Sequence, residues 1–200
     1  HVVWGGSVIQ HEDGKYYMFA SIWKGSHLGS WVNLSQVALA VSNNPKGPFE
    51  FKAIILPYRN KKYWDGGMTH NPTIRKHKDT YYLFYIGSTF QHERSQDKIN
   101  QRDPRYQKAW IHKRIGVATA KHPEGPWKRY DKPLIEPRPG HWDAVNTSNP
   151  APVIHDDGSV TLFYKSSNMF YPQRLQKENK AGLPRFILGI ARADSIFEHY

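Results

Sequence analysis

The sequence predicts an all-β fold, a β-propeller of four-stranded antiparallel blades, with about three blades in this chain. Three observations support this prediction: a long internal repeat, short polar turns between β-rich aromatic runs, and a third apolar run that follows each pair. Composition does not divide the 200 residues into unlike halves, so we expect one propeller domain, or part of one, over residues 1–200.

The repeat relates residues 45–72 to residues 123–150 without a gap, at a shift of 123 − 45 = 78 residues. Nine positions are identical, and they pair Pro45, Gly47, Pro48, Leu56, Trp64, Asp65, Thr69, Asn71 and Pro72 with Pro123, Gly125, Pro126, Leu134, Trp142, Asp143, Thr147, Asn149 and Pro150. Such a repeat is typical of a fold made of equivalent units.

Each unit begins with a hairpin, because Asp-Gly or Lys-Asp separates two β-rich runs. The hairpins are expected at residues 7–19, 73–85 and 152–164. Third strands are expected at 37–41, 115–119 and 188–191, and Pro-x-Gly-Pro turns lead from the first two into an outer fourth strand. The predicted blades cover residues 1–57, 67–136 and 145–200, approximately.

Composition excludes several functions. The chain has no cysteine, which rules out disulfides and thiolate chemistry, and we expect neither a metal nor another cofactor. A net charge of +11 would attract an anionic partner, but no nucleic-acid-binding motif accompanies it, so we expect no nucleic-acid partner. No apolar run approaches the roughly 18 residues of a membrane helix, so no membrane partner is expected either.

Three blades would leave unpaired strand edges, which natural sheets avoid. We therefore expect either further blades in a longer protein or pairing with another copy. The chain does not begin with Met, so a leader could have been removed, or the chain could be a piece of something longer. The location stays open, with a secreted or periplasmic protein favoured over a cytoplasmic one.

Alternating strand directions place the long loops at 21–36, 90–114 and 168–186 on one face, together with the connections between blades. These loops are rich in aromatic and basic residues. Flat rings beside cations suit sugars, including acidic or sulfated ones. Long loops on one face also favour that face as the functional one.

The repeated Trp-Asp pairs lie in the connections between blades, on the same face. Asp65 and Asp143 could supply the acid and base of glycoside cleavage, with Trp64 and Trp142 beside the sugar. The alternative is that each Trp-Asp pair supports its blade.

The motifs Thr69-His70-Asn71-Pro72 and Thr147-Ser148-Asn149-Pro150 open two blades and can point at the axis. His70 is their ionisable member, a candidate proton donor or hydroxyl-binding group. Glu136 is a further candidate catalytic carboxylate. The remaining candidates for substrate binding are Trp4, Trp23, Asn71, His141, Ser148 and Asn149.

These blade openings, the Asp-Gly-Lys-Tyr-Tyr hairpin and the Pro-x-Gly-Pro turn resemble glycoside hydrolase families 32, 43, 62, 68 and 117 over nearly the whole chain. The resemblance implies a five-bladed ring, of which this chain would be about three fifths. Family 43 places carboxylates at three blade openings, where this sequence has Gly5 or Gly6, Asn71, and Ser148 or Asn149. Either Asp65 and Asp143 replace them, or His70 acts as a histidine does in family 117.

The function expected from the sequence is hydrolysis of a terminal sugar from a plant or algal oligosaccharide or polysaccharide, by inversion. Two alternatives remain open. The first is a glycan-binding propeller without activity, which the missing family carboxylates favour. The second is a phosphorolytic enzyme resembling family 130, with phosphate held by the basic loops.

Overall fold

The computed structural model describes residues 1–25, 28–89, 99, 101–167, 186–198 and 200. Within these residues, eleven strands form three antiparallel sheets. The first sheet contains β1 (Val2–Gln10), β2 (Tyr16–Trp23), β3 (Gln36–Ser42) and β4 (Glu50–Leu56). The second contains β5 (Met68–His77), β6 (Thr80–Ser88), β7 (Arg114–Ala120) and β8 (Lys128–Arg129). The third contains β9 (Ser148–Ile154), β10 (Val160–Ser167) and β11 (Phe186–Ala193).

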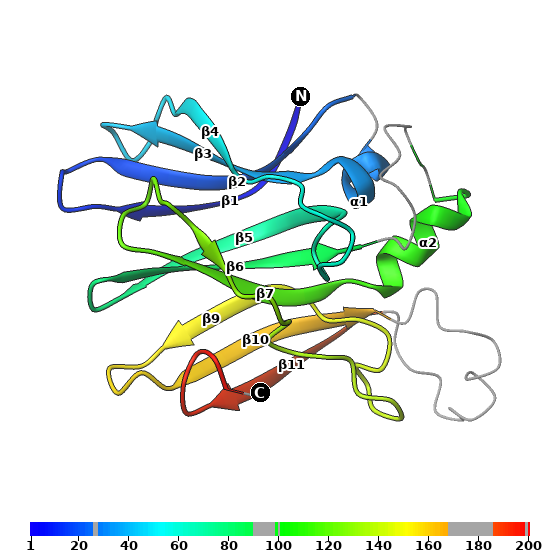
Figure 1. Ribbon diagram of the computed structural model, residues 1–200. Coiled ribbons are helices and arrows are strands. Elements are labelled where there is room, and N and C mark those ends of the chain that lie inside the picture. The colour runs from blue at the N-terminus through cyan, green and yellow to red at the C-terminus, as the bar shows by residue number, and fades with distance from the viewer. Residues whose placement is uncertain (26–27, 90–98, 100, 168–185, 199) are drawn as a thin grey trace.

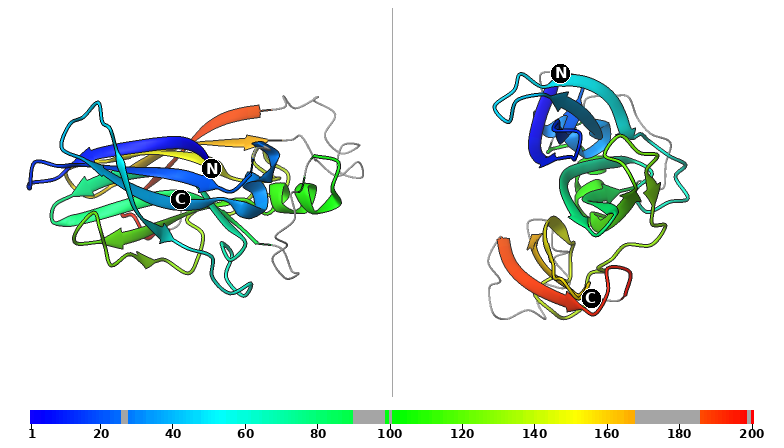
Figure 2. Two further views of the ribbon diagram at one scale, coloured as in Figure 1. Left: turned by 90° about the horizontal axis from the view of Figure 1, so that it is seen from above. Right: turned by 90° about the vertical axis from the view of Figure 1, so that its left-hand side faces the viewer.

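The sheets are blades that stand side by side in an arc (Figures 1 and 2). The first strands of the blades are neighbours, because β5 lies next to β1 on one side and next to β9 on the other. Strand order follows chain order in each sheet, as a propeller blade requires. The predicted fold, its hairpins and its third strands are therefore confirmed, and fourth strands are described in the first two blades.

The cores lie between the blades. Side chains alternate across a strand, so Leu83 and Tyr85 of β6 face the first blade while Phe84 faces the third. Phe19 and Leu39 complete the first core. The middle blade is thus buried on both faces.

The two end blades each keep one face exposed. Val8 and Phe51 are exposed on the first blade, and Leu188, 80% exposed, lies with other exposed apolar side chains on the third. A monomer rarely exposes such surfaces without a partner. Coverage of these faces by further blades or a second copy stays a prediction.

The described parts of the long loops lie at one end of the arc, where Figure 1 also shows both helices. These are α1 (Trp31–Leu34), preceded by the 3-10 turn Leu28–Ser30, and α2 (Pro104–Ile111). Neither described helix is long or apolar enough to cross a bilayer. The predicted loop face is confirmed where it is described, and most of the third loop (168–185) lies outside the described residues.

Candidate functional site

The first strand of every blade has a bulge at the end that carries the helices. The pairing register shifts between Trp4 and Ser7 in β1, between His70 and Thr73 in β5, and just after Ser148 in β9. Trp4, His70 and Ser148 therefore occupy equivalent positions. Bulges re-aim side chains and are frequent beside functional sites.

The residue after each of these positions has a left-handed backbone: φ is +61° at Gly5, +47° at Asn71 and +54° at Asn149. Asn tolerates this conformation better than other residues with side chains, which explains why Asn is repeated here. Asn71 Nδ2 donates to Asn149 Oδ1 at 3.3 Å, and a Cβ on Gly5 would lie 2.9 Å from Asn71 Oδ1. The three blades therefore meet at the axis through these bulges.

A cavity of about 330 Å³ opens beside these bulges, and we call it the axial pocket. Its wall includes four tryptophans and a tyrosine, and its charged groups are basic. The lining residues are Trp4, Trp23, Leu28, Gly29, Trp31, His70, Asn71, Ile86, Gln101, Tyr106, Trp110, Lys113, Asn149 and Lys165. Of the predicted site residues, the structure brings Trp4, Trp23, His70, Asn71 and Asn149 together here.

His70 is 5% exposed and packs against two indoles, stacked on Trp31 at 4.6 Å and edge-on to Trp23 at 5.7 Å. Its Nδ1 lies 2.8 Å from Ser35 Oγ, and that hydroxyl donates its hydrogen to the carbonyl of Thr69. Ser35 Oγ can then only accept from His70, so the ring proton lies on Nδ1. Nε2 is left with its lone pair and has no hydrogen bond to any described residue.

Burial, aided by the positive charge of Lys113, lowers the pKa of His70 to about 3. The ring is therefore neutral near pH 7. A neutral ring with a free lone pair on Nε2 accepts a hydrogen bond, so His70 fits the hydroxyl-binding role better than that of a proton donor.

Lys113 precedes β7 and is 2% exposed. Its ammonium lies over the ring of Trp110 at 3.6 Å and that of Trp31 at 5.6 Å, two cation–π contacts. Burial, with repulsion from Lys165, lowers the pKa of Lys113 well below its usual range. Neither lysine forms an ion pair with any residue that the structure describes.

The structure places Asp65 in a buried cluster of hydrogen bonds, outside the lining of the axial pocket. Its carboxylate is fully buried and accepts from Arg59, from the hydroxyl of Tyr85 at 2.7 Å and from Arg129 at 3.2 Å. These contacts join the connection between blades to the outer part of the second blade. Asp65 does not line the axial pocket, so substrate has no access to it.

Asp143 repeats this arrangement and also lies outside the lining of the axial pocket. It is fully buried, accepts from Arg138 at 2.9 Å and accepts from the hydroxyl of Tyr164 at 2.7 Å. We call Asp65, Asp143 and their arginine and tyrosine partners the buttress clusters. The alternative that Trp-Asp supports each blade fits the geometry.

Trp64 and Trp142 pack inside their blades beside these clusters and do not line the pocket. A Cβ on Gly116 would lie 2.2 Å from Trp64 Cζ2, and one on Gly189 would lie 2.0 Å from Trp142 Cζ2. Each indole thus packs on a glycine of its blade's third strand. The two tryptophans are therefore equivalent in the repeat, and neither lines the axial pocket.

Three more predicted residues lie away from the pocket lining. Glu136 pairs with Arg114 at 2.8 Å and lines a separate cavity beside Phe197. His141 is exposed. Ser148 is buried and donates to the carbonyl of Lys165 at 3.1 Å, so it positions a pocket residue without reaching the pocket itself.

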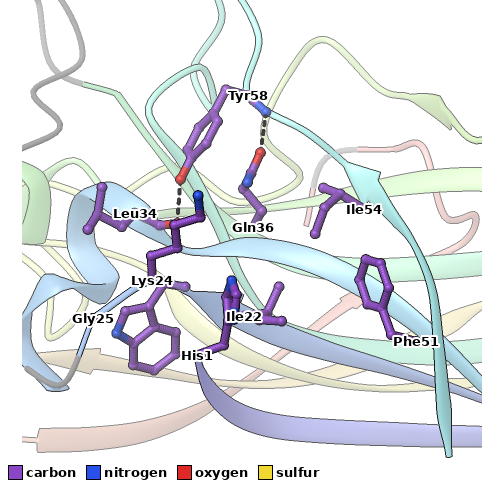
Figure 3. A pocket seen from close by; sticks show the side chains of 10 residues that line it. His1, Ile22, Lys24, Gly25, Leu34, Gln36, Phe51, Ile54 and Tyr58 are labelled. Carbon is purple, nitrogen blue, oxygen red and sulfur yellow. Dashed lines mark hydrogen bonds between the residues drawn. The ribbon is translucent and has the colours of Figure 1, made fainter.

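A larger cavity, about 780 Å³, lies on the first blade and is shown in Figure 3. Its wall includes Ile22, Phe51 and Ile54. Its polar groups are largely satisfied within the chain: Gln36 accepts from the Tyr58 amide at 3.1 Å, and the Tyr58 hydroxyl donates to the Leu34 carbonyl. In the axial pocket, His70 Nε2 has no hydrogen bond and Lys113 and Lys165 have no ion pair to the residues that the structure describes. The axial pocket is therefore the better candidate for chemistry.

Sequence reasoning placed Trp31, Tyr106, Trp110 and Lys113 on the correct face but did not select them. It missed Lys165 altogether. A signal was available for Lys165, since it interrupts an apolar strand at the position where the other blades have Ser21 and Ile86. Among the described residues, no three His, Cys, Asp or Glu side chains gather as metal ligands.

No protein-family model matches the chain, and no curated protein matches its sequence. Solved structures match its fold. A family 117 glycoside hydrolase from the marine bacterium Zobellia galactanivorans superposes with a TM-score of 0.68 over 98% of this chain and 53% of its own, at 19% identity. A thermostable family 43 glycoside hydrolase gives 0.59 over 95% and 54%, at 18% identity.

An endo-arabinase from Bacteroides thetaiotaomicron gives a TM-score of 0.57 over 95% of this chain and 50% of its own, at 12% identity. These matches define the class: the chain has the fold of the propeller glycoside hydrolases. The resemblance to families 43 and 117 is confirmed at the level of fold. The chain spans about half the length of these solved structures.

Proposed function

We propose that this chain belongs to a glycoside hydrolase in which the axial pocket holds a terminal sugar of a plant or algal saccharide. The observation that carries the proposal is the pocket itself, where three bulged strands and two helices bring indole rings beside a neutral histidine. Sugar rings present flat C–H faces to aromatic rings and hydroxyls to hydrogen-bond acceptors. The fold of glycoside hydrolases adds support by analogy.

His70 has a definite place in this proposal. With the proton on Nδ1, its Nε2 accepts a hydrogen bond from a sugar hydroxyl or from an attacking water. Hydrolysis with inversion needs a general acid as well as a base. No Asp or Glu lines the described part of the pocket, so we propose that other parts of the whole protein supply a carboxylate.

The absence of carboxylates from the described lining also favours a second candidate, a glycan-binding propeller without activity. The two functions differ in turnover. A binding module retains the sugar unchanged, whereas a hydrolase releases a reducing sugar whose first-formed anomer reports inversion or retention.

The test uses the whole protein, a panel of plant and algal oligosaccharides, and the variants His70→Gln and His77→Gln. His77 lies at the other end of the same strand, away from the pocket, and serves as the matched control. We expect His70→Gln to lower kcat/KM by about tenfold, through loss of the hydrogen bond to the sugar, and His77→Gln to leave it unchanged. Binding without turnover would favour the binding module, and no binding of any saccharide would overturn both functions.

A further inference from the structure

The axial pocket contains two positive charges from different blades and no described counter-charge. Lys113 comes from the second blade and Lys165 from the third, and both line the pocket. They are near enough for Lys165 to disfavour the charged form of Lys113. The other titratable groups of the described lining are His70, which is neutral, and Tyr106.

A buried ammonium without a counter-ion is costly, and proteins normally pair such groups. The equivalent position in the first blade shows that the fold does not need a lysine. Ser35 occupies that position in the first blade. The equivalence follows from one repeated hydrogen bond: the Ser35 carbonyl accepts from the Thr69 amide, and the Lys113 carbonyl accepts from the Thr147 amide. Lys113 is therefore a departure from the repeat, located at the candidate site.

The surroundings of Lys113 hold its ammonium inside the pocket. The rings of Trp110 and Trp31 lie beneath it, and Trp31 also stacks on His70. A lysine on a flexible stem would otherwise extend toward water. The cation is thus fixed beside the aromatic surface and the bare acceptor that a sugar ring would contact.

We propose that Lys113 and Lys165 bind an anionic substituent, a carboxylate or a sulfate ester, on the sugar held in the axial pocket. The inference rests on the proposed function and adds the class of substrate. The sugar ring packs on the indoles, a hydroxyl donates to His70 Nε2, and the anion supplies the counter-charge that the pocket lacks. Bonds from an ammonium to such an anion are charge-assisted and stronger than neutral ones.

Binding should also be coupled to protonation. An anion next to Lys113 favours its charged form, which burial disfavours in the free protein. An acidic sugar should therefore take up a proton when it binds at a pH above the lowered pKa of Lys113, and its neutral analogue should not. Proton uptake distinguishes this pocket from a surface basic patch, whose lysines are already charged.

The experiment is isothermal titration calorimetry of the whole protein with matched oligosaccharides: a neutral sugar, its uronate counterpart and its sulfated counterpart, in two non-phosphate buffers of different ionisation enthalpy. The variants are Lys113→Met, Lys165→Met and the control Lys128→Met, which removes the same charge from an exposed site on β8. We expect at least one acidic sugar to bind more tightly than its neutral counterpart, with proton uptake, and the preferred one identifies the anion.

Each pocket substitution should raise the Kd of the preferred acidic sugar by about tenfold or more, leave that of the neutral sugar nearly unchanged, and spare folding. Lys128→Met should leave both unchanged. Neutral and acidic sugars binding equally, or all three variants losing the same affinity, would overturn the inference while leaving the proposed function standing. Competition by inorganic phosphate alone, with no preference among sugars, would overturn it in favour of phosphorolysis.

Discussion

Two groups of buried polar side chains lie at the end of the molecule that carries the helices, and they differ in how their charges are balanced. In the buttress clusters, Asp65 and Asp143 each meet an arginine and a tyrosine hydroxyl. In the axial pocket, Lys113 and Lys165 meet aromatic rings and no described acid. Removing one member of a paired buried charge destabilises the fold. A charged side chain without a described counter-charge, in contrast, is a candidate for binding a charged ligand.

The largest effect expected from this difference is on stability. Asp65→Ala should lower the free energy of unfolding by about 3–5 kcal/mol, because Arg59, Arg129 and Tyr85 would all lose their buried carboxylate, and only Arg59 would keep another described acid, Asp131. Asp143→Ala should cost less, about 1–3 kcal/mol, since Arg138 is 50% exposed and can turn to water. Chemical denaturation of both variants measures the two losses.

Sugar turnover by the molecules that remain folded is the control for these variants. The buttress role predicts near-normal kcat in both. A large loss of kcat with an unchanged Tm would restore the catalytic assignment of the two carboxylates.

The second effect is a pH dependence of the free energy of unfolding, caused by His70 in the axial pocket. The pKa of His70 is lowered to about 3 in the folded state and is about 6.5 in an unfolded chain. Between these values the unfolded state binds the proton and the folded state does not, so acidification favours unfolding. The free energy of unfolding should fall by up to about 1.4 kcal/mol per pH unit across this window.

Denaturation of wild type, His70→Gln and His77→Gln from pH 7 to pH 4 isolates this contribution. His70→Gln should flatten the slope, and His77→Gln should leave it as in wild type. Equal slopes in all three proteins would mean that His70 is protonated in the folded state, contrary to the neutral ring inferred for the pocket.

The smallest effect concerns Trp4, which is 54% exposed and lines the pocket. Trp4→Ala removes little buried surface, so stability should change by less than about 0.5 kcal/mol. Affinity for the sugar should fall by about 2- to 10-fold, the range expected for one aromatic contact. Phe51→Ala, an exposed aromatic position in the Figure 3 cavity, is the matched control and should not affect affinity.

The fold was predictable because every blade repeats the same local signals. Thr69 and Thr147 illustrate this: each hydroxyl accepts from a third-strand amide, of Val37 or Ile115, and donates to a carbonyl before the next blade. Helix α2 was not predicted, although Asp103 followed by Pro104 is an N-terminal helix signal and the Asp103 side chain does cap the helix.

The site was predictable only in part, because repetition identifies architecture rather than chemistry. Trp-Asp recurs at two blades, and that recurrence directed the catalytic prediction to two carboxylates that lie outside the axial pocket. The pocket is built once, because residues differ at equivalent positions: Trp4 and His70 line it, whereas their counterpart Ser148 does not. Which of these face a common cavity depends on bulges and on long loops, whose geometry the pattern of apolar residues does not determine.

The most direct test of the axial pocket as the sugar site is a crystal structure of the whole protein with a bound oligosaccharide. We expect a sugar ring against Trp31 or Trp110, with one hydroxyl about 2.6–3.2 Å from His70 Nε2. Asp65 and Asp143 should keep their arginine and tyrosine partners. A sugar bound at the buttress clusters, or in the Figure 3 cavity with the axial pocket empty, would contradict this assignment.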